Sequence, residues 1–93
     1  MKVLGISRLR DSSHAQMREG LENFGKHGLP GVEGFWFSAD ARTVFTLYEI
    51  DDIADLHKYA TFYAPYIEHV ETHLVTDGTA GVANMQAGLD LAP

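Results

Sequence analysis

The sequence predicts a small α+β domain, and two observations carry this prediction. The stretch from Gly34 to Ile50 is rich in aromatic and β-branched residues on either side of the small polar segment Ser38–Ala41, which is typical of a strand hairpin. One further strand-like stretch lies on each side of this hairpin, and an amphipathic stretch separates each of them from it. The expected order is β-α-β-β-α-β, whose usual arrangement is a four-stranded antiparallel sheet, ordered 4-1-3-2, with both helices on one face.

The first strand is expected over Lys2–Leu9, where apolar residues alternate with small or polar ones and a polar cluster follows. Gly5 and Ser7 leave little side chain on one face of this strand. Such a gap marks either the close approach of a helix, which is the commoner case, or a place where a ligand lies.

The first helix is expected from about residue 13 to residue 26. Ser13 and Gln16 have the spacing of a capping box. The apolar residues that follow recur at helical intervals: Met17, Leu21 and Phe24. Gly20 inside the helix is unfavourable by about 1 kcal/mol relative to alanine, so we expect this part of the helix to pack closely against the sheet. The segment Gly28-Leu29-Pro30-Gly31 then breaks the chain before the hairpin.

Side chains along a strand point alternately to the two faces of the sheet, and the apolar residues of the hairpin occupy both sets of alternate positions, called phases below. Counted along the chain, one phase holds Trp36, Val44 and Tyr48. The other phase holds Phe35, Phe37, Phe45 and Leu47. A sheet wetted on one side would leave one phase polar, so we expect both faces to be covered. Two helices can cover one face, and the second face is expected to meet another copy of the chain or a ligand.

The second helix is expected to begin at the Asp51–Asp52 pair, because carboxylates are favourable at the positive end of a helix. Its inner stripe consists of Ile53, Leu56, Ala60 and Tyr63. Pro65 ends this helix, and the last strand alternates over residues 68–76. In the Gly- and Ala-rich tail, apolar residues stand at helical spacing, which indicates either a short helix or an arm lying on a partner. We therefore expect one domain over residues 1–77 and a C-terminal extension over residues 78–93.

This element order is that of the ferredoxin-like fold. Its apolar second sheet face is expected to pack on the same face of a second chain, which gives a dimeric α+β barrel and a homodimer.

Two stretches resemble known families of dimeric α+β-barrel proteins, a group that includes aromatic-polyketide cyclases, cofactor-free monooxygenases and haem-degrading enzymes. The hairpin ending TLYEIDD is similar to a family of short bacterial domains of unknown function in which a glutamate, here Glu49, closes the third strand. The stretch ADLHKYATFYAPYIEHVE is similar to muconolactone isomerase, with Leu56-His57 in the helix and Pro65-Tyr66 at its end. The resemblance implies the ferredoxin-like fold and a homodimer.

Composition excludes several classes of partner. The chain has 93 residues, a formal net charge of −6 and seven scattered Lys and Arg residues, which argues against nucleic acid and anionic membrane. The apolar run after Lys2 is too short for a signal-peptide core. The absence of cysteine removes disulfides and thiolate chemistry, and fits a cytoplasmic protein.

Aromatic and ionisable residues near the helix–sheet layer are candidates for a small-molecule site. His57 lies one residue from the inner helix stripe and is a candidate acid–base group that reaches toward Tyr48, with Glu49 as a possible general base. A small apolar or aromatic ligand would be held by Trp36, Tyr63 and Tyr66. The alternative is that His57 bonds a neighbouring group on the helix flank and that the aromatic residues serve packing.

A second pattern is His69-x-Glu71-x-His73, in which strand alternation puts two imidazoles and a carboxylate on one side. These are ligand types for a metal, but consecutive residues on one strand face rarely converge on one ion. We therefore favour ordinary polar residues on an edge strand.

Three functions follow from these candidates. The first is a small cofactor-independent enzyme that acts by acid–base chemistry on a cyclic or unsaturated molecule, of the isomerase, cyclase or monooxygenase type. The second is a non-catalytic dimeric module that binds a ligand or only associates. The third is a metal- or haem-binding protein that uses His69 and His73. A cavity surrounded by Trp36, Tyr48, His57 and Tyr63 would favour the first, and convergence of the two histidines would favour the third.

Overall fold

The computed structural model describes residues 1–29 and 31–92. Pro30, in the predicted break, and Pro93, at the end of the predicted extension, lie outside the described residues. Along the described chain, strands and helices follow in this order: β1 (Lys2–Leu9), α1 (His14–His27), β2 (Val32–Phe37), β3 (Thr43–Glu49), α2 (Ile53–Tyr63), β4 (Ile67–Leu74) and α3 (Gly78–Asp90).

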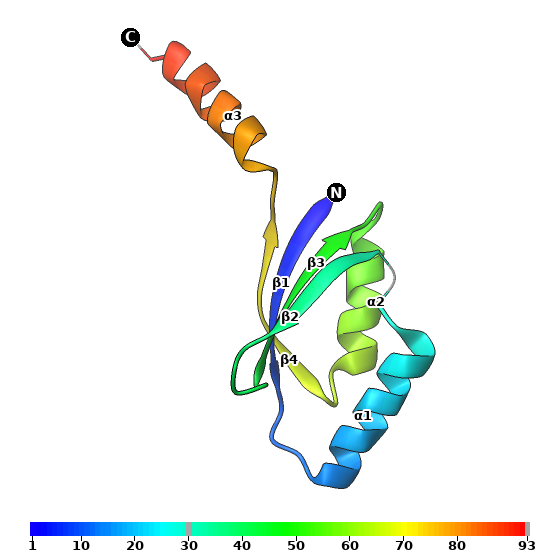
Figure 1. Ribbon diagram of the computed structural model, residues 1–93. Helices are drawn as coiled ribbons and strands as arrows, with labels where there is room; N and C mark the ends of the chain where they lie inside the picture. The colour runs from blue at the N-terminus through cyan, green and yellow to red at the C-terminus, as the bar shows by residue number, and fades with distance from the viewer. Residues whose placement is uncertain (30, 93) are drawn as a thin grey trace.

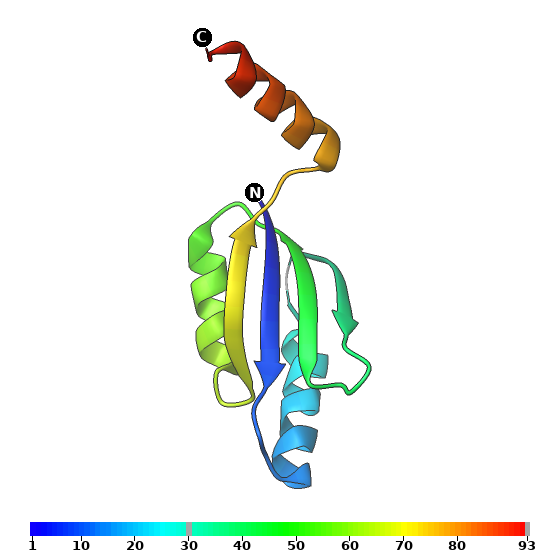
Figure 2. The same ribbon diagram turned by 90° about the vertical axis from the view of Figure 1, so that its left-hand side faces the viewer.

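The four strands form one antiparallel sheet in the order β2-β3-β1-β4, which is the predicted order read from the other edge. Helices α1 and α2 lie on the same face of the sheet, and the opposite face is open (Figure 1). The predicted ferredoxin-like α+β fold is confirmed. Figure 2 looks onto the open face, with the two helices behind the strands.

Side-chain caps fix the starts of both covering helices, as the sequence predicts. At α1, the Ser13 hydroxyl accepts a hydrogen bond from the Gln16 backbone N–H at 3.2 Å, and the Gln16 side chain accepts one from the Ser13 N–H at 2.9 Å. At α2, Asp52 Oδ1 accepts from the Ala54 N–H at 2.9 Å. These bonds satisfy backbone donors that a helix start otherwise leaves free.

The hairpin pairs its strands in a way that corrects the predicted phases. Trp36 lies opposite Phe45, and Phe35 lies opposite Thr46. Directly opposed residues of antiparallel strands point to the same face, so Trp36 shares the open face with Phe45. The prediction that Trp36 and Tyr48 share a face was wrong. From residue 34 on, even-numbered residues of β2 lie opposite odd-numbered residues of β3, so Trp36 and Tyr48 point to opposite faces of the sheet.

The core lies between the sheet and α2. Val3, Tyr48 and Ile50 form its buried cluster, and Leu56 packs against them. The Tyr48 ring occupies the space that Gly5 leaves open, since a Cβ at Gly5 would lie 3.4 Å from that ring. The small side chains of β1 therefore admit a large aromatic ring from the neighbouring strand.

Gly20 of α1 packs closely, but on a different partner from the one predicted. A Cβ at Gly20 would lie 3.0 Å from the ring of Tyr66, which follows α2. The close contact thus joins α1 to the α2–β4 connection and not to the sheet. It holds the middle of α1 against this connection.

Helix α3 projects away from the rest of the molecule (Figures 1 and 2). The chain measures 60 Å in its longest dimension and has a radius of gyration of 16.6 Å, whereas a compact domain of this length has a radius of gyration of about 12 Å. Apolar residues of α3 are largely exposed, with Met85 at 71%. Among the described residues, no helix has both the length and the apolar character needed to cross a membrane.

Candidate functional site

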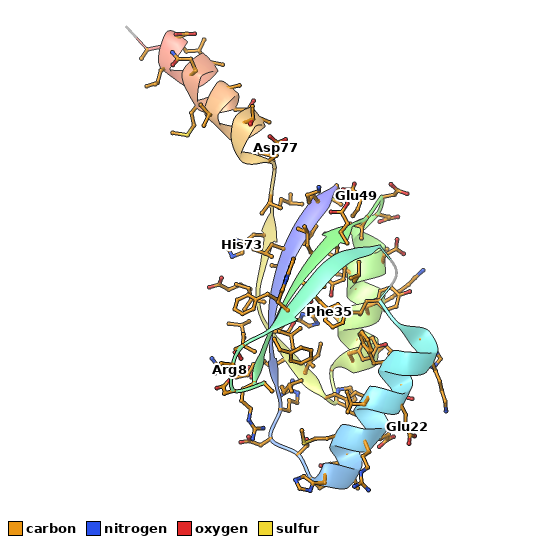
Figure 3. All side chains as sticks on the ribbon, viewed as in Figure 1. Arg8, Glu22, Phe35, Glu49, His73 and Asp77 are labelled. Atoms are coloured by element: carbon orange, nitrogen blue, oxygen red, sulfur yellow. The ribbon has the colours of Figure 1, made fainter. Side chains whose placement is uncertain are left out.

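A cavity of about 280 Å³ lies between the sheet and α1. Its wall is largely apolar. The apolar residues include Met17, Leu21 and Phe24 of α1, Phe35 and Phe37 of β2, Val44 of β3, Leu9 of β1 and Ile67 of β4. Figure 3 shows Phe35 pointing from the sheet toward the helices. The apolar residues of α1 recur every three or four positions, so they form a stripe along one face of the helix, and this stripe makes one side of the cavity.

A few hydroxyl groups interrupt the apolar wall. Ser7, Thr46 and Tyr48 contribute them from the sheet, and Tyr63 and Tyr66 contribute them from the end of α2 and the segment after it. The Tyr63 hydroxyl donates to the Gly28 carbonyl at 2.7 Å, and the Tyr66 hydroxyl accepts from the Asn23 amide at 2.9 Å. These bonds hold the two helix-side phenols in place. Arg10, Ser12 and Gln16 also line the cavity, and Arg10 Nε donates to the Ala64 carbonyl while the Gln16 side chain accepts from Ser13.

Burial raises the pKa of both Tyr48 and Tyr63, because a phenolate is poorly solvated there. For Tyr48, a hydrogen bond with the Thr46 side chain opposes this effect but does not reverse it. Both phenols are therefore protonated at neutral pH. Tyr63 already donates its hydroxyl hydrogen to the Gly28 carbonyl, so of these two phenols it is Tyr48 that could donate a hydrogen bond to a ligand oxygen.

Some residues of the predicted small-molecule site line the cavity and others lie elsewhere. Tyr48, Tyr63 and Tyr66 line the cavity, as expected. His57 instead lies exposed on α2, outside the described cavity lining, so the expectation that it reaches toward Tyr48 was wrong. Its neighbour Leu56 faces the core, and one further residue turns a helix by about 100°, which carries the imidazole out of the layer.

Trp36 and Glu49 also lie away from the cavity. Trp36 is on the open face of the sheet, where its ring covers Gly34. The Glu49 carboxylate pairs with the amino group of Met1 at 2.6 Å, and this bond holds the pKa of Glu49 below its usual range. Glu49 is thus an exposed ion-paired residue at the end of β3, where it has no access to a cavity ligand.

The three candidate metal ligands, His69, Glu71 and His73, do not lie on one face of the sheet. A bulge in β4 shifts its register, so that Ile6 lies opposite Glu71 while Ser7 lies opposite His69. His69 therefore shares the helix-covered face with Ser7, whereas Glu71 and His73 pair with each other at 2.9 Å on the open face. Figure 3 shows His73 on the side away from the helices. Within residues 1–29 and 31–92, no three His, Asp or Glu side chains gather for a metal.

A family model for a domain of unknown function, DUF3303, matches residues 1–89. The chain belongs to the DUF3303 family. The match includes the ferredoxin-like body and nearly all of α3. It gives no support to the resemblance to muconolactone isomerase. A comparison of this DUF3303 chain with curated proteins finds no match.

One polar pair of the DUF3303 chain was not predicted as part of a site. Ser7 Oγ lies 3.1 Å from His69 Nδ1, and Ser7 lines the cavity with only 6% of its surface exposed. The sequence offered one signal for this site, the run of small residues Gly5 and Ser7 on one face of β1. The sequence indicated His69 only as a possible metal ligand and gave no signal for its position beside Ser7, because the bulge that turns it there has no local sequence signature.

Proposed function

We propose that the protein binds a small, flat, largely apolar molecule in the cavity between the sheet and α1. The cavity carries this proposal, because its volume of about 280 Å³ is near the lower end of the range for small-molecule sites and its wall is apolar with few hydroxyls. Aromatic side chains give such a ligand large contact surfaces, and the hydroxyls orient its polar atoms.

We further infer that the bound molecule undergoes cofactor-independent acid–base chemistry, of the kind that isomerises, cyclises or oxygenates a cyclic or unsaturated compound. The protonated Tyr48 phenol supports this, since it donates a hydrogen bond to a ligand oxygen on which negative charge develops. The role assigned to Tyr48 is therefore that of a donor. A separate group has to accept the proton.

Filling the cavity is expected to weaken ligand binding. The change Val44→Trp places a large ring inside the apolar wall, and we expect it to weaken binding of 4-nitrophenol, a flat aromatic probe, by at least about tenfold, equivalent to 1.4 kcal/mol. Isothermal titration calorimetry measures this. Phe45→Trp is the matched control, because the neighbouring residue on β3 faces the opposite side of the sheet. Equal losses in both variants, or no binding by the wild type, would contradict the proposed site.

A second function, self-association, is favoured by the open face of the sheet. Apolar residues of three adjacent strands gather there: Leu4, Ile6, Trp36, Phe45 and Leu47. Trp36 is 57% exposed and Phe45 is 37% exposed. Contiguous exposed apolar residues of this size mark an interface, and a two-fold axis would place the same patch on both chains. We propose a homodimer in which the two open faces pack together as an α+β barrel.

A charge in the centre of this patch is expected to dissociate the dimer. Leu47→Lys buries an unpaired ammonium group in the proposed interface, and we expect the dissociation constant to rise at least about tenfold. Light scattering over a dilution series gives the mass. Thr61→Lys makes the same charge change on the exposed side of α2 and is expected to leave the dimer intact. A wild-type protein that stays monomeric at micromolar concentration would refute the assembly.

A further inference from the structure

We propose that Ser7 and His69 form a proton relay that accepts a proton from the molecule bound in the cavity and passes it toward solvent. This inference rests on the proposed function, because it needs a ligand in that cavity. It identifies the proton acceptor that the chemistry requires. It also defines the ligand class further, as a molecule with a weakly acidic hydroxyl group such as a phenol or an enol.

The two members of the pair sit in different surroundings. Ser7 is on the central strand β1 and is nearly buried in the cavity wall. His69 is on the edge strand β4 and is exposed, although its ring nitrogen reaches Ser7 Oγ at 3.1 Å. A hydrogen bond therefore crosses from the cavity to the surface of the molecule. Nδ1 of His69 contacts Ser7, which lines the cavity, and another part of His69 is exposed to solvent.

The bulge in β4 creates this arrangement. With regular pairing, the register of Ile6 with Glu71 would place Val70 opposite Ser7 and turn His69 to the open face. The extra residue instead sets His69 opposite Ser7. Bulges that re-aim one side chain are frequent beside binding and catalytic sites, where the local disruption of the ladder has a function.

The transfer is balanced in protons and charge. The ligand O–H donates its proton to Ser7 Oγ as the Ser7 hydroxyl gives its own proton to His69 Nδ1. One O–H bond of the ligand is broken and one N–H bond of His69 is formed. The ligand becomes an anion, with its oxygen hydrogen-bonded by the re-formed Ser7 hydroxyl, and His69 becomes an imidazolium ion. Partial burial lowers the pKa of His69, so the imidazole is neutral near neutral pH before a ligand binds. The negative charge that forms on the ligand then favours the imidazolium ion and opposes this effect of burial.

The ionisation state of bound 4-nitrophenol tests the relay directly. This probe ionises near neutral pH and absorbs visible light strongly only as the anion. An apolar cavity without a base favours the neutral phenol, whereas a working relay stabilises the anion beside the imidazolium. We expect 4-nitrophenol bound to the wild type to show the visible absorbance of the anion. The variants Ser7→Ala and His69→Gln are expected to bind the probe mainly as the neutral phenol, with loss of most of that absorbance.

Calorimetry on the same samples measures binding of the probe, which tests the cavity independently of the proton relay. His73→Gln is the matched control, since it removes an imidazole from the same strand on the opposite face. It is expected to leave the absorbance of the bound probe unchanged. If the wild type binds the probe and shows the same absorbance as His69→Gln and Ser7→Ala, the relay is overturned while the cavity remains a binding site. If the wild type does not bind the probe, the proposed function fails and the relay fails with it.

Discussion

Replacing Tyr48 by alanine is expected to destabilise the protein by about 3 to 5 kcal/mol, the range found for truncating a buried aromatic residue. Only 7% of Tyr48 is exposed, and its side chain packs with Val3 and Ile50 in the buried cluster of the core. Its ring also fills the space above Gly5, where the strand itself offers no side chain. Chemical denaturation followed by circular dichroism measures the change.

The variant Tyr48→Phe separates packing from hydrogen bonding. It keeps the ring and removes only the hydroxyl, so we expect a loss of about 1 kcal/mol. The same variant is expected to weaken ligand binding if the phenol donates to the ligand. A loss below about 1 kcal/mol for Tyr48→Ala would show that this ring is not central to the core.

Gly31→Ala is expected to have an effect of comparable size. Gly31 has φ of +79°, and a Cβ at this position would overlap the Glu49 carbonyl oxygen. The unfavourable backbone conformation contributes about 1 to 3 kcal/mol, and the collision adds to it. The collision also displaces the strand end, because the Gly31 carbonyl accepts a hydrogen bond from the Glu49 N–H at 2.7 Å.

Gly28→Ala is the matched control for this variant. Gly28 also has positive φ, +61°, but no heavy atom lies within 4 Å of the position that a Cβ would occupy. Both variants place a Cβ at positive φ, so a larger loss for Gly31→Ala than for Gly28→Ala reports the collision with Glu49. Similar losses for both would show that the backbone near Gly31 relaxes freely and that its close approach to β3 is unimportant.

The order of elements was predictable because its signals are local. The alternation of Lys2–Leu9 and the capping pair Ser13–Gln16 lie within a few residues of the structure that they specify. Asp52 caps α2 for the same reason. These signals, combined with the preferred arrangement of a β-α-β-β-α-β chain, were sufficient to predict the sheet order.

The candidate site was predicted only in part, because it depends on how distant strands align. Tyr48, Tyr63 and Tyr66 lie together in the lining of one cavity, since the helix–sheet layer determines their position, and their roles toward a ligand stay predictions. His57 was expected beside the cavity but is exposed, because it lies one residue, or about 100° of helical rotation, beyond the core-facing Leu56. His69 was assigned to the wrong face, because a bulge of one residue reverses the alternation that follows it.

The projecting helix α3 makes amide hydrogen exchange a direct reporter of assembly. Isolated helices shorter than about 12–15 residues are marginal in water, and α3 has 13 residues, including Gly78, Gly81 and Gly88. In a lone chain its amide protons therefore exchange almost as fast as those of an unfolded peptide. Slow exchange that appears with increasing protein concentration would reveal that a neighbouring chain covers α3. The degree of slowing would then measure the free energy of opening at each residue of the covered helix.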